Sequence, residues 1–208
     1  KHNGKICDIL INNNKIEKIA KKIQIDSQTK IFKSDNLHIS QGWLDMHVNF
    51  GQPGFEQRET IENGLNVAAK GGYTEVLLMP NTNPSIDNSS MINFIKSFSK
   101  KHIVNIQVAG NLTINQEGKN IVEIHDMTKN GCIAFTDDKK SIQNNELMKI
   151  ALLYMKNSDA LLMNYPNDIK MQNKGVINEG KISTQLGLKG IPNIAEEMMV
   201  LRNPLIIF

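Results

Sequence analysis

The sequence predicts an α/β fold: a parallel TIM (β/α)8-type barrel that is incomplete in this chain and follows a small N-terminal β module. Apolar runs typical of strands recur about every 30 residues, which is the length of one strand-plus-helix unit. The first residues instead show the short alternations and turn residues of a β-hairpin. We therefore place the β module at residues 1–41 and the first part of the barrel at residues 42–208.

The β module is predicted from the segment "CDILINNNKIEKIAKKIQI", residues 7–25. Two short apolar alternations flank "NNNK", a turn rich in asparagine. Asparagine tolerates the left-handed backbone conformation that tight hairpin turns require. This stretch is therefore expected to form a β-hairpin.

The strands of the barrel are predicted where apolar residues cluster and β-branched or aromatic residues are frequent. These runs read "WLDMHVNF" (43–50), "TEVLLMP" (74–80), "NIQVAG" (105–110), "CIAFTDD" (132–138) and "ALLMNYP" (160–166). Five strand-plus-helix units fall short of the eight that close a barrel.

Helices are predicted between the strands, where apolar residues recur at helical spacing. The segment 85–102 offers Asp87, Asn88 and Ser89 as N-cap candidates. The segments 120–131 and 144–157 show the same amphipathic period, and Gly131 is a typical helix stop.

The chain then becomes polar and rich in Gly, Asn and Lys over residues 167–193. We interpret this stretch as a loop over the mouth of the barrel. Residues 194–203, "IAEEMMVLRN", have a helical pattern, which Pro204 is expected to interrupt.

Composition excludes several classes of protein. No apolar run approaches the ~20 residues that cross a bilayer, so no membrane association is expected. Lys plus Arg number 24 and Asp plus Glu 21, for a net charge of +3, and the lysines are spread along the chain, so no nucleic-acid partner is expected. Cys7 and Cys132 form no CxxC pair, which favours a reduced, cytoplasmic protein.

Candidate site residues follow the predicted strands, because side chains at the carboxyl ends of barrel strands point into the mouth. They are His47 and Asn49, Asn81, Asp137 and Asp138, and Asn164 and Tyr165. A hydrolytic zinc site needs several imidazole and carboxylate ligands and an open position for water. One histidine, one or two carboxylates and a tyrosine do not supply such a set, so we assign no catalytic residue.

Long motifs resemble those of the dihydroorotases in the cyclic amidohydrolase superfamily. Residues 42–87, "GWLDMHVNFGQPGFEQRETIENGLNVAAKGGYTEVLLMPNTNPSID", resemble the pattern G-[FW]-[IVL]-D-x-H-x-H-x-R-[ED]-P-G, followed by A-A-A-x-G-G-[FY]-T and M-P-N-T. The similarity continues through "GCIAFTDD" and "INEGKISTQLGLKGIPNIAEEMMVLR". It implies an amidohydrolase barrel whose N-terminal module is part of a β-sandwich completed by C-terminal strands.

The chain departs from the family pattern at positions that carry the chemistry. The resemblance implies two metal-binding histidines on the first strand, of which His47 matches the first while Asn49 stands at the second. Gly51 occupies the position of the arginine that holds the substrate carboxylate. Tyr165 stands where the fifth strand of the family supplies another histidine. The resemblance therefore implies a degenerate metal site.

Two features of the family site persist. Asn81 lies in the "PNT" motif, which the resemblance links to binding of the substrate carboxylate, so Asn81 and Gly51 mark a vestigial substrate site. Asp137 stands where several relatives use an aspartate as a metal ligand, and Asp138 is its neighbour. The sequence does not choose between the two carboxylates.

Three functions are compatible with these residues. The first is a dihydroorotase-family protein of pyrimidine biosynthesis with impaired or absent catalysis, a pseudoenzyme with a structural or regulatory role. The second is an active dihydroorotase or related hydrolase that opens a C–N bond in a cyclic amide. The third is a non-catalytic module that binds a small ligand.

Cofactor, partner and chain length follow from the same reasoning. No cofactor is expected in this chain, and zinc is expected only if the ancestral site is retained. The resemblance implies aspartate transcarbamoylase as a partner, and we expect a homo-oligomer. Because five units cannot close a barrel, the 208 residues are expected to belong to a polypeptide of about twice this length.

Overall fold

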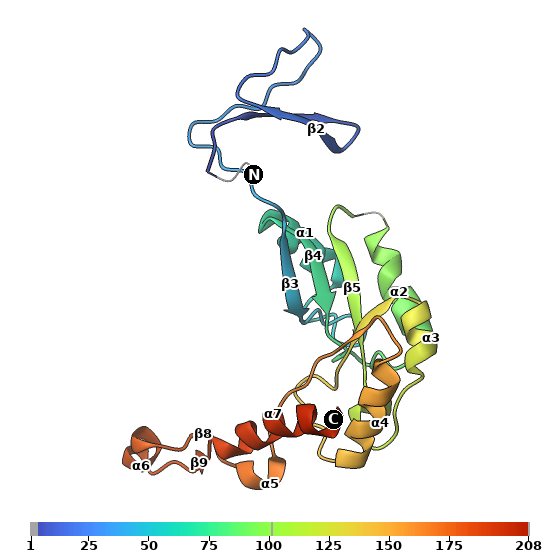
Figure 1. Cartoon of the computed structure of the whole chain (residues 1–208), viewed down its shortest axis with the longest axis vertical. Coiled ribbons are helices and arrows are strands. Elements are labelled where there is room, and N and C mark those ends of the chain that lie inside the picture. Colours follow the sequence, from blue (N-terminus) through green and yellow to red (C-terminus); the bar gives the residue numbers. More distant parts are fainter. Residues whose placement is uncertain (1–3, 101, 208) are drawn as a thin grey trace. The chain divides into compact units, whose positions relative to one another are not determined.

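The computed structural model describes residues 4–100 and 102–207, and for residues 204, 206 and 207 only the backbone. The chain divides into two compact units, one ending at Ser40 and the other beginning at Gln41. Figure 1 shows the first as a strand pair with long loops and the second as a sheet with helices.

The first unit contains a β-hairpin. Strands β1 (Asp8–Asn12) and β2 (Lys15–Ala20) pair antiparallel. Asn13 and Asn14 form the turn with φ values of 49° and 59°, the left-handed conformation that a two-residue hairpin turn requires. The hairpin predicted from the asparagine-rich turn is therefore present.

The second unit is built on a five-stranded parallel sheet with the order β3-β4-β5-β6-β7. Its strands are β3 (Trp43–Val48), β4 (Tyr73–Leu78), β5 (Asn105–Gly110), β6 (Cys132–Phe135) and β7 (Leu161–Leu162). The helices that follow the first four are α1 (Ile61–Lys70), α2 (Ser89–Ser99), α3 (Ile124–Lys129) and α4 (Asn145–Met155), with a 3-10 turn at Ile114–Gln116. The spatial order equals the chain order, which confirms the predicted incomplete barrel.

Alternate residues of the strands face opposite sides of the sheet, as the strand period requires. Val76 and Leu78 of β4 join the large core beneath the helices, whereas Leu77 packs in a small cluster on the other face. The large core also holds Ile106, Val108 and Phe135 from the sheet and Ile61, Leu65, Ile92, Ile95, Met127 and Met148 from the helices. Each fully buried side chain of this kind contributes about 1.5–3 kcal/mol, so this face carries most of the stability.

Capping side chains fix where the helices begin. Of the three predicted candidates for α2, Asn88 is the N-cap, and its Oδ1 accepts from the Met91 nitrogen at 3.2 Å. Asn144 caps α4 by accepting from the Glu146 and Leu147 nitrogens at 2.9 and 3.2 Å. Such caps satisfy donors that the first helical turn leaves free.

The prediction of a loop over residues 167–193 is wrong in part, because the segment contains short elements. They are α5 (Ile169–Gln172), β8 (Ile177–Asn178), α6 (Lys181–Leu186) and β9 (Gly190–Ile191), with β8 and β9 parallel. Local polar groups hold them: Asp168 Oδ1 accepts from the Met171 nitrogen at 2.9 Å, and Gly187 ends α6 with a φ of 63°.

The predicted interruption at Pro204 is also wrong, since α7 (Ile194–Ile207) runs through it. Proline removes one backbone donor, but its fixed φ is compatible with helical geometry. Arg202 ties α7 to the loop before α4 by donating from Nη1 to the Ile142 carbonyl at 2.8 Å.

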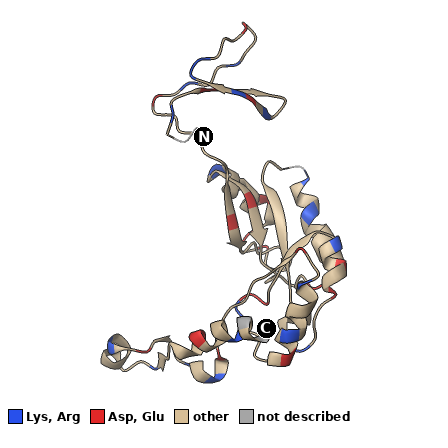
Figure 2. Ribbon diagram, viewed as in Figure 1, with Lys and Arg blue, Asp and Glu red and all other residues tan. Residues whose placement is uncertain are grey.

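Charge and hydropathy add two observations. Figure 2 shows basic and acidic residues on many elements of both units. The absence of a nucleic-acid partner stays a prediction. Within the described ranges, none of the helices is both long and apolar enough to cross a membrane.

Candidate functional site

Four polar side chains meet at the carboxyl ends of β3, β4 and β6. His47 lies at the end of β3 with Asn49 just beyond it, Asn81 follows β4, and Asp138 follows β6. His47 Nε2 lies 3.1 Å from Asp138 Oδ1, and Asn81 Nδ2 donates to Asp138 Oδ2 at 3.2 Å. Asn81 Nδ2 also donates to Asn49 Oδ1, and Asn49 Nδ2 lies 3.5 Å from His47 Nδ1.

Local backbone geometry aims these groups at one another. Val48 packs into the helix-covered core, so His47, one residue earlier, faces the opposite side of the sheet. Asp138 has a φ of 53°, and its backbone nitrogen donates to Thr136 Oγ1 at 3.0 Å. This turn directs the Asp138 side chain toward His47.

Asp137 has different neighbours from Asp138. Its Oδ1 accepts from the backbone nitrogens of Leu112 and Thr113, both at 2.9 Å, and its Oδ2 accepts from the Thr113 hydroxyl. Burial raises the pKa of the Asp137 carboxyl, and the hydrogen bonds from Thr113 and Leu112 oppose that rise. Asp137 therefore anchors the loop after β5, and of the two candidate carboxylates Asp138 is the one that meets His47.

Sequence reasoning missed the two threonines that hold Asp137 and Asp138 in different environments. Thr113 and Thr136 are both buried, and each bonds to one member of the aspartate pair. Thr136 directly precedes the pair, but Thr113 lies in the preceding strand-plus-helix unit and no sequence signal connects it with the site.

Gly51 lies in a loop that is closed around it. Its nitrogen donates to the Glu59 carbonyl at 3.0 Å, and its own carbonyl accepts from the Phe55 nitrogen at 2.8 Å. A Cβ atom at position 51 would lie 2.1 Å from the Phe55 carbonyl oxygen. The loop has therefore adapted to glycine, and an arginine here requires the backbone to move.

Tyr165 lines a cavity of about 690 Å³ beside α7, with Glu196, Glu197 and Leu201 on its wall. The lining of that cavity does not include His47 or the side chains bonded to it. Tyr165 therefore lies just beyond β7. Among the hydrogen bonds of the described residues, none joins Tyr165 to the strand-end cluster of His47, Asn49, Asn81 and Asp138.

Asn164, the other candidate at this strand end, has a buried amide nitrogen. It has no hydrogen-bond partner within residues 4–100 and 102–207. A buried donor left unpaired costs about 1–3 kcal/mol. The polar side chains at the end of β7 are therefore less completely hydrogen-bonded than those at the ends of β3, β4 and β6.

The residues at the strand ends do not fit a zinc ion. In the described part of the chain, no three His, Cys, Asp or Glu side chains gather closely enough to hold a metal. The cluster has only His47 and Asp138 as strong ligand types, and the other two members are amides. Asn81 presents a donor nitrogen to Asp138, whereas a cation requires lone pairs.

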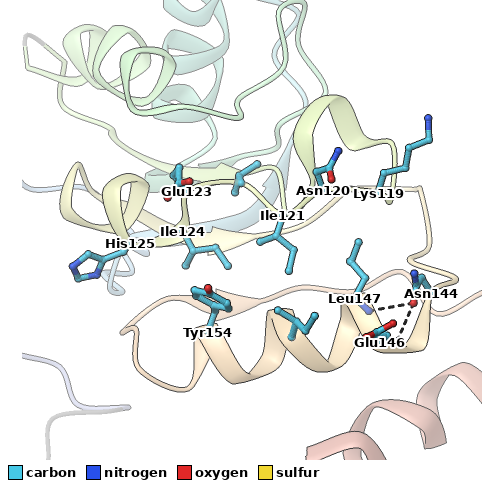
Figure 3. Close-up of a pocket in the computed structure, with 12 residues that line it drawn as sticks. Lys119, Asn120, Ile121, Glu123, Ile124, His125, Asn144, Glu146, Leu147 and Tyr154 are labelled. Carbon is cyan, nitrogen blue, oxygen red and sulfur yellow. Dashed lines mark hydrogen bonds between the residues drawn. The ribbon is translucent and has the colours of Figure 1, made fainter.

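A separate groove of about 490 Å³ lies between residues 119–125 and α4. Figure 3 shows His125 and Tyr154 near one end, and Lys119, Asn120 and Asn144 near the other. Leu147, Ile150 and Ile124 contribute apolar surface. The groove lies among the outer helices, away from the strand-end cluster, and no sequence motif predicted it.

Comparison with known proteins places these observations in a family. A family model described as dihydro-orotase-like matches residues 38–207. Dihydroorotases of Thermoanaerobacter sp. (strain X514) and Syntrophus aciditrophicus (strain SB) are 40% and 37% identical to the chain, covering 95% and 96% of it and 46% and 47% of their own lengths. The chain thus spans about half the length of the curated relatives it matches.

A solved structure supports the fold independently. The L-hydantoinase (dihydropyrimidinase) of Arthrobacter aurescens superposes with a TM-score of 0.68 at 16% sequence identity, over 96% of this chain and 46% of that one. At this identity the similarity concerns the fold alone. It agrees with an incomplete parallel barrel.

Proposed function

Because the chain belongs to the dihydro-orotase-like family, and because hydrogen-bonded amides occupy its strand ends, we propose that it is part of a dihydroorotase-family protein of pyrimidine biosynthesis with impaired or absent catalysis. The observation that carries this proposal is the pairing of Asp138 with His47 on one oxygen and Asn81 on the other. Both carboxylate oxygens are bonded to side chains of this chain, one of them an amide, which supports a hydrogen-bonded polar network at this place.

The chemistry of cyclic-amide hydrolysis explains why this arrangement matters. Opening the ring needs an activated water and polarisation of the amide carbonyl, and zinc would supply both when bound. The residues of this chain offer one imidazole, one carboxylate and two amides at that place. They also lack the arginine fork that best holds a carboxylate, because Gly51 stands there.

A structural role requires surfaces that bind partners. Helix α4 presents Ile150, Leu153 and Tyr154 outward, with 41%, 53% and 62% of their surface exposed. Outward-facing apolar side chains on one helix support a contact with another subunit. Self-association and association with aspartate transcarbamoylase are part of the proposal, and light scattering of the protein alone and mixed with that enzyme tests both.

A steady-state assay of dihydroorotate hydrolysis tests the loss of activity. The full-length protein, supplemented with zinc, is compared with the Thermoanaerobacter dihydroorotase under the same conditions. We expect no turnover above the uncatalysed background for this protein and normal turnover for the relative. A rate of ~1 s⁻¹ or more, an ordinary enzyme rate, would contradict the proposal.

The His47–Asp138 pair favours one alternative, an active cyclic amidohydrolase. A histidine bonded to a nearly buried carboxylate is the arrangement of a general base. If that alternative holds, the assay shows turnover that Asp138→Asn and His47→Gln both remove. If turnover is absent, calorimetry with dihydroorotate measures whether the site can still bind this ligand.

A further inference from the structure

We propose that the four strand-end side chains form a metal-independent clamp that holds the carboxyl ends of β3, β4 and β6 together. Their contacts make a closed ring: His47 meets Asp138, Asp138 meets Asn81, Asn81 meets Asn49, and Asn49 meets His47. Each member therefore has two partners within the ring. This inference deepens the proposed function, because it says what the altered site does in place of holding a metal.

The ring joins strands that the backbone does not join. In the sheet order, β3 and β6 are separated by β4 and β5, so no backbone hydrogen bond links them. In a flat sheet, strands three positions apart lie about 14 Å from each other. A 3.1 Å contact between His47 and Asp138 therefore spans the concave side of a curved sheet and resists its flattening.

The electrostatics of Asp138 make the ring cooperative. The Asp138 side chain is 8% exposed, whereas that of His47 is 45% exposed. A nearly buried carboxylate is costly unless donors compensate for its lost hydration, and here His47 and Asn81 supply them. Loss of Asn81 would remove a donor from Asp138 and the partner of Asn49 in one step.

A neighbouring set of contacts keeps Asp138 in place. Asp137 bonds to Leu112 and Thr113 in the loop after β5, which fixes the backbone on one side of Asp138. Thr136 fixes the other side through the Asp138 nitrogen. The carboxylate in the ring is therefore held on a supported turn and not on a free loop.

Thermal unfolding of the full-length protein tests the clamp. We expect the Tm to be the same within about 1 °C with a chelator, with added zinc, or with neither, because the ring needs no metal. We expect Asn81→Ala to lower the Tm by about 2–4 °C. Asn93→Ala is the matched control, because Asn93 Nδ2 also bonds to an asparagine, Asn130 Oδ1 at 3.1 Å, but on an exposed surface. The control should leave the Tm unchanged.

A double-mutant cycle tests whether the members act together. Asn49→Ala alone should lower the Tm, and the Asn49→Ala/Asn81→Ala pair should lower it by clearly less than the sum, since each change already breaks their shared bond. Asn49→Ala is the milder variant, and it keeps the test usable if Asn81→Ala does not fold. Additive effects, or a Tm that rises with zinc and falls with chelator, would overturn the clamp.

These outcomes are separate from those of the activity assay. One possible result is a protein that hydrolyses dihydroorotate, has a Tm that a chelator does not change, and shows non-additive effects of Asn49→Ala and Asn81→Ala. That result would contradict the proposed function and support the clamp. An inactive protein whose Tm depends on zinc would support the loss of activity and overturn the clamp.

Discussion

The helix-covered face of the sheet and the carboxyl ends of its strands differ in what they demand of the sequence. The covered face is filled by buried apolar side chains such as Ile106 and Phe135, and residues of suitable size and polarity pattern suffice there. At the strand ends, a metal site requires particular donor atoms, and here Asn49 and Asn81 bond to their neighbours instead. Under the proposed function, the family fold persists while the chemistry of its site changes.

The largest expected effect lies on the covered face. Ile106→Ala on β5 removes a side chain that is 0% exposed, and we expect it to lower the free energy of unfolding by about 2–5 kcal/mol. Ile103→Ala is the control, because Ile103 is 83% exposed just before the same strand, and its effect should stay within about 0.5 kcal/mol. Urea unfolding measures both, and equal losses would contradict the placement of the core.

Next comes the loop that has closed around Gly51. We expect Gly51→Ala to lower the free energy of unfolding by about 1–3 kcal/mol, because its Cβ would meet the Phe55 carbonyl. Gly180→Ala, where no atom lies within 4 Å of the added Cβ, should be much milder. Equal stability of the two variants would contradict the close packing around Gly51. For the same reason, Gly51→Arg should not restore carboxylate binding unless residues 51–59 are remodelled.

A smaller effect concerns the pH dependence contributed by Asp137. Burial raises its pKa above the ordinary value of 3.8, so the folded state holds this proton more tightly than the unfolded state. The stability that protonation contributes is therefore full below about pH 3.8 and is lost as the pH rises through the folded pKa. Wild type should lose stability relative to Asp137→Asn as the pH rises from about 3.8 through the folded pKa of Asp137, measured by urea unfolding. If the wild type instead becomes more stable than Asp137→Asn as the pH rises, the free energies of unfolding contradict a raised pKa for Asp137.

The smallest perturbation is chemical labelling of Cys7 and Cys132. Burial raises the pKa of Cys132 to about 11, while Cys7 is only partly buried. Because the thiolate is the reactive form, we expect Cys7 to react with a thiol reagent at pH 8 and Cys132 to react only on unfolding. In Cys7→Ser no fast-reacting thiol should remain. Fast labelling of Cys132 would show that the covered face opens.

The fold was predictable because its signals are local. A run of apolar residues marks β4, and the N-cap candidates around Asn88 mark the start of α2. Each signal lies within a few consecutive residues. The short elements within residues 167–193 and the passage of α7 through Pro204 were not predictable. They depend on backbone conformation and tertiary contacts, such as that of Arg202 with Ile142, which a local pattern does not contain.

The candidate site was predictable in position but not in detail. Strand ends located His47, Asn49, Asn81 and the aspartate pair, since parallel strands bring their carboxyl ends to one edge. The separation of Asp137 from Asp138 rests on Thr113, which lies far away in the sequence, and on a positive φ. The closing of the ring by Asn81 depends on which way its amide points, and no residue pattern states that.

Zinc content tests most directly whether this family member has exchanged its metal site for a hydrogen-bonded network. Elemental analysis of the full-length protein, purified with zinc in the growth medium and without chelator, gives the answer. We expect less than about 0.2 equivalents of zinc per chain, since a stable site needs three or four strong ligands. Stoichiometric zinc that disappears in His47→Ala would contradict the exchange.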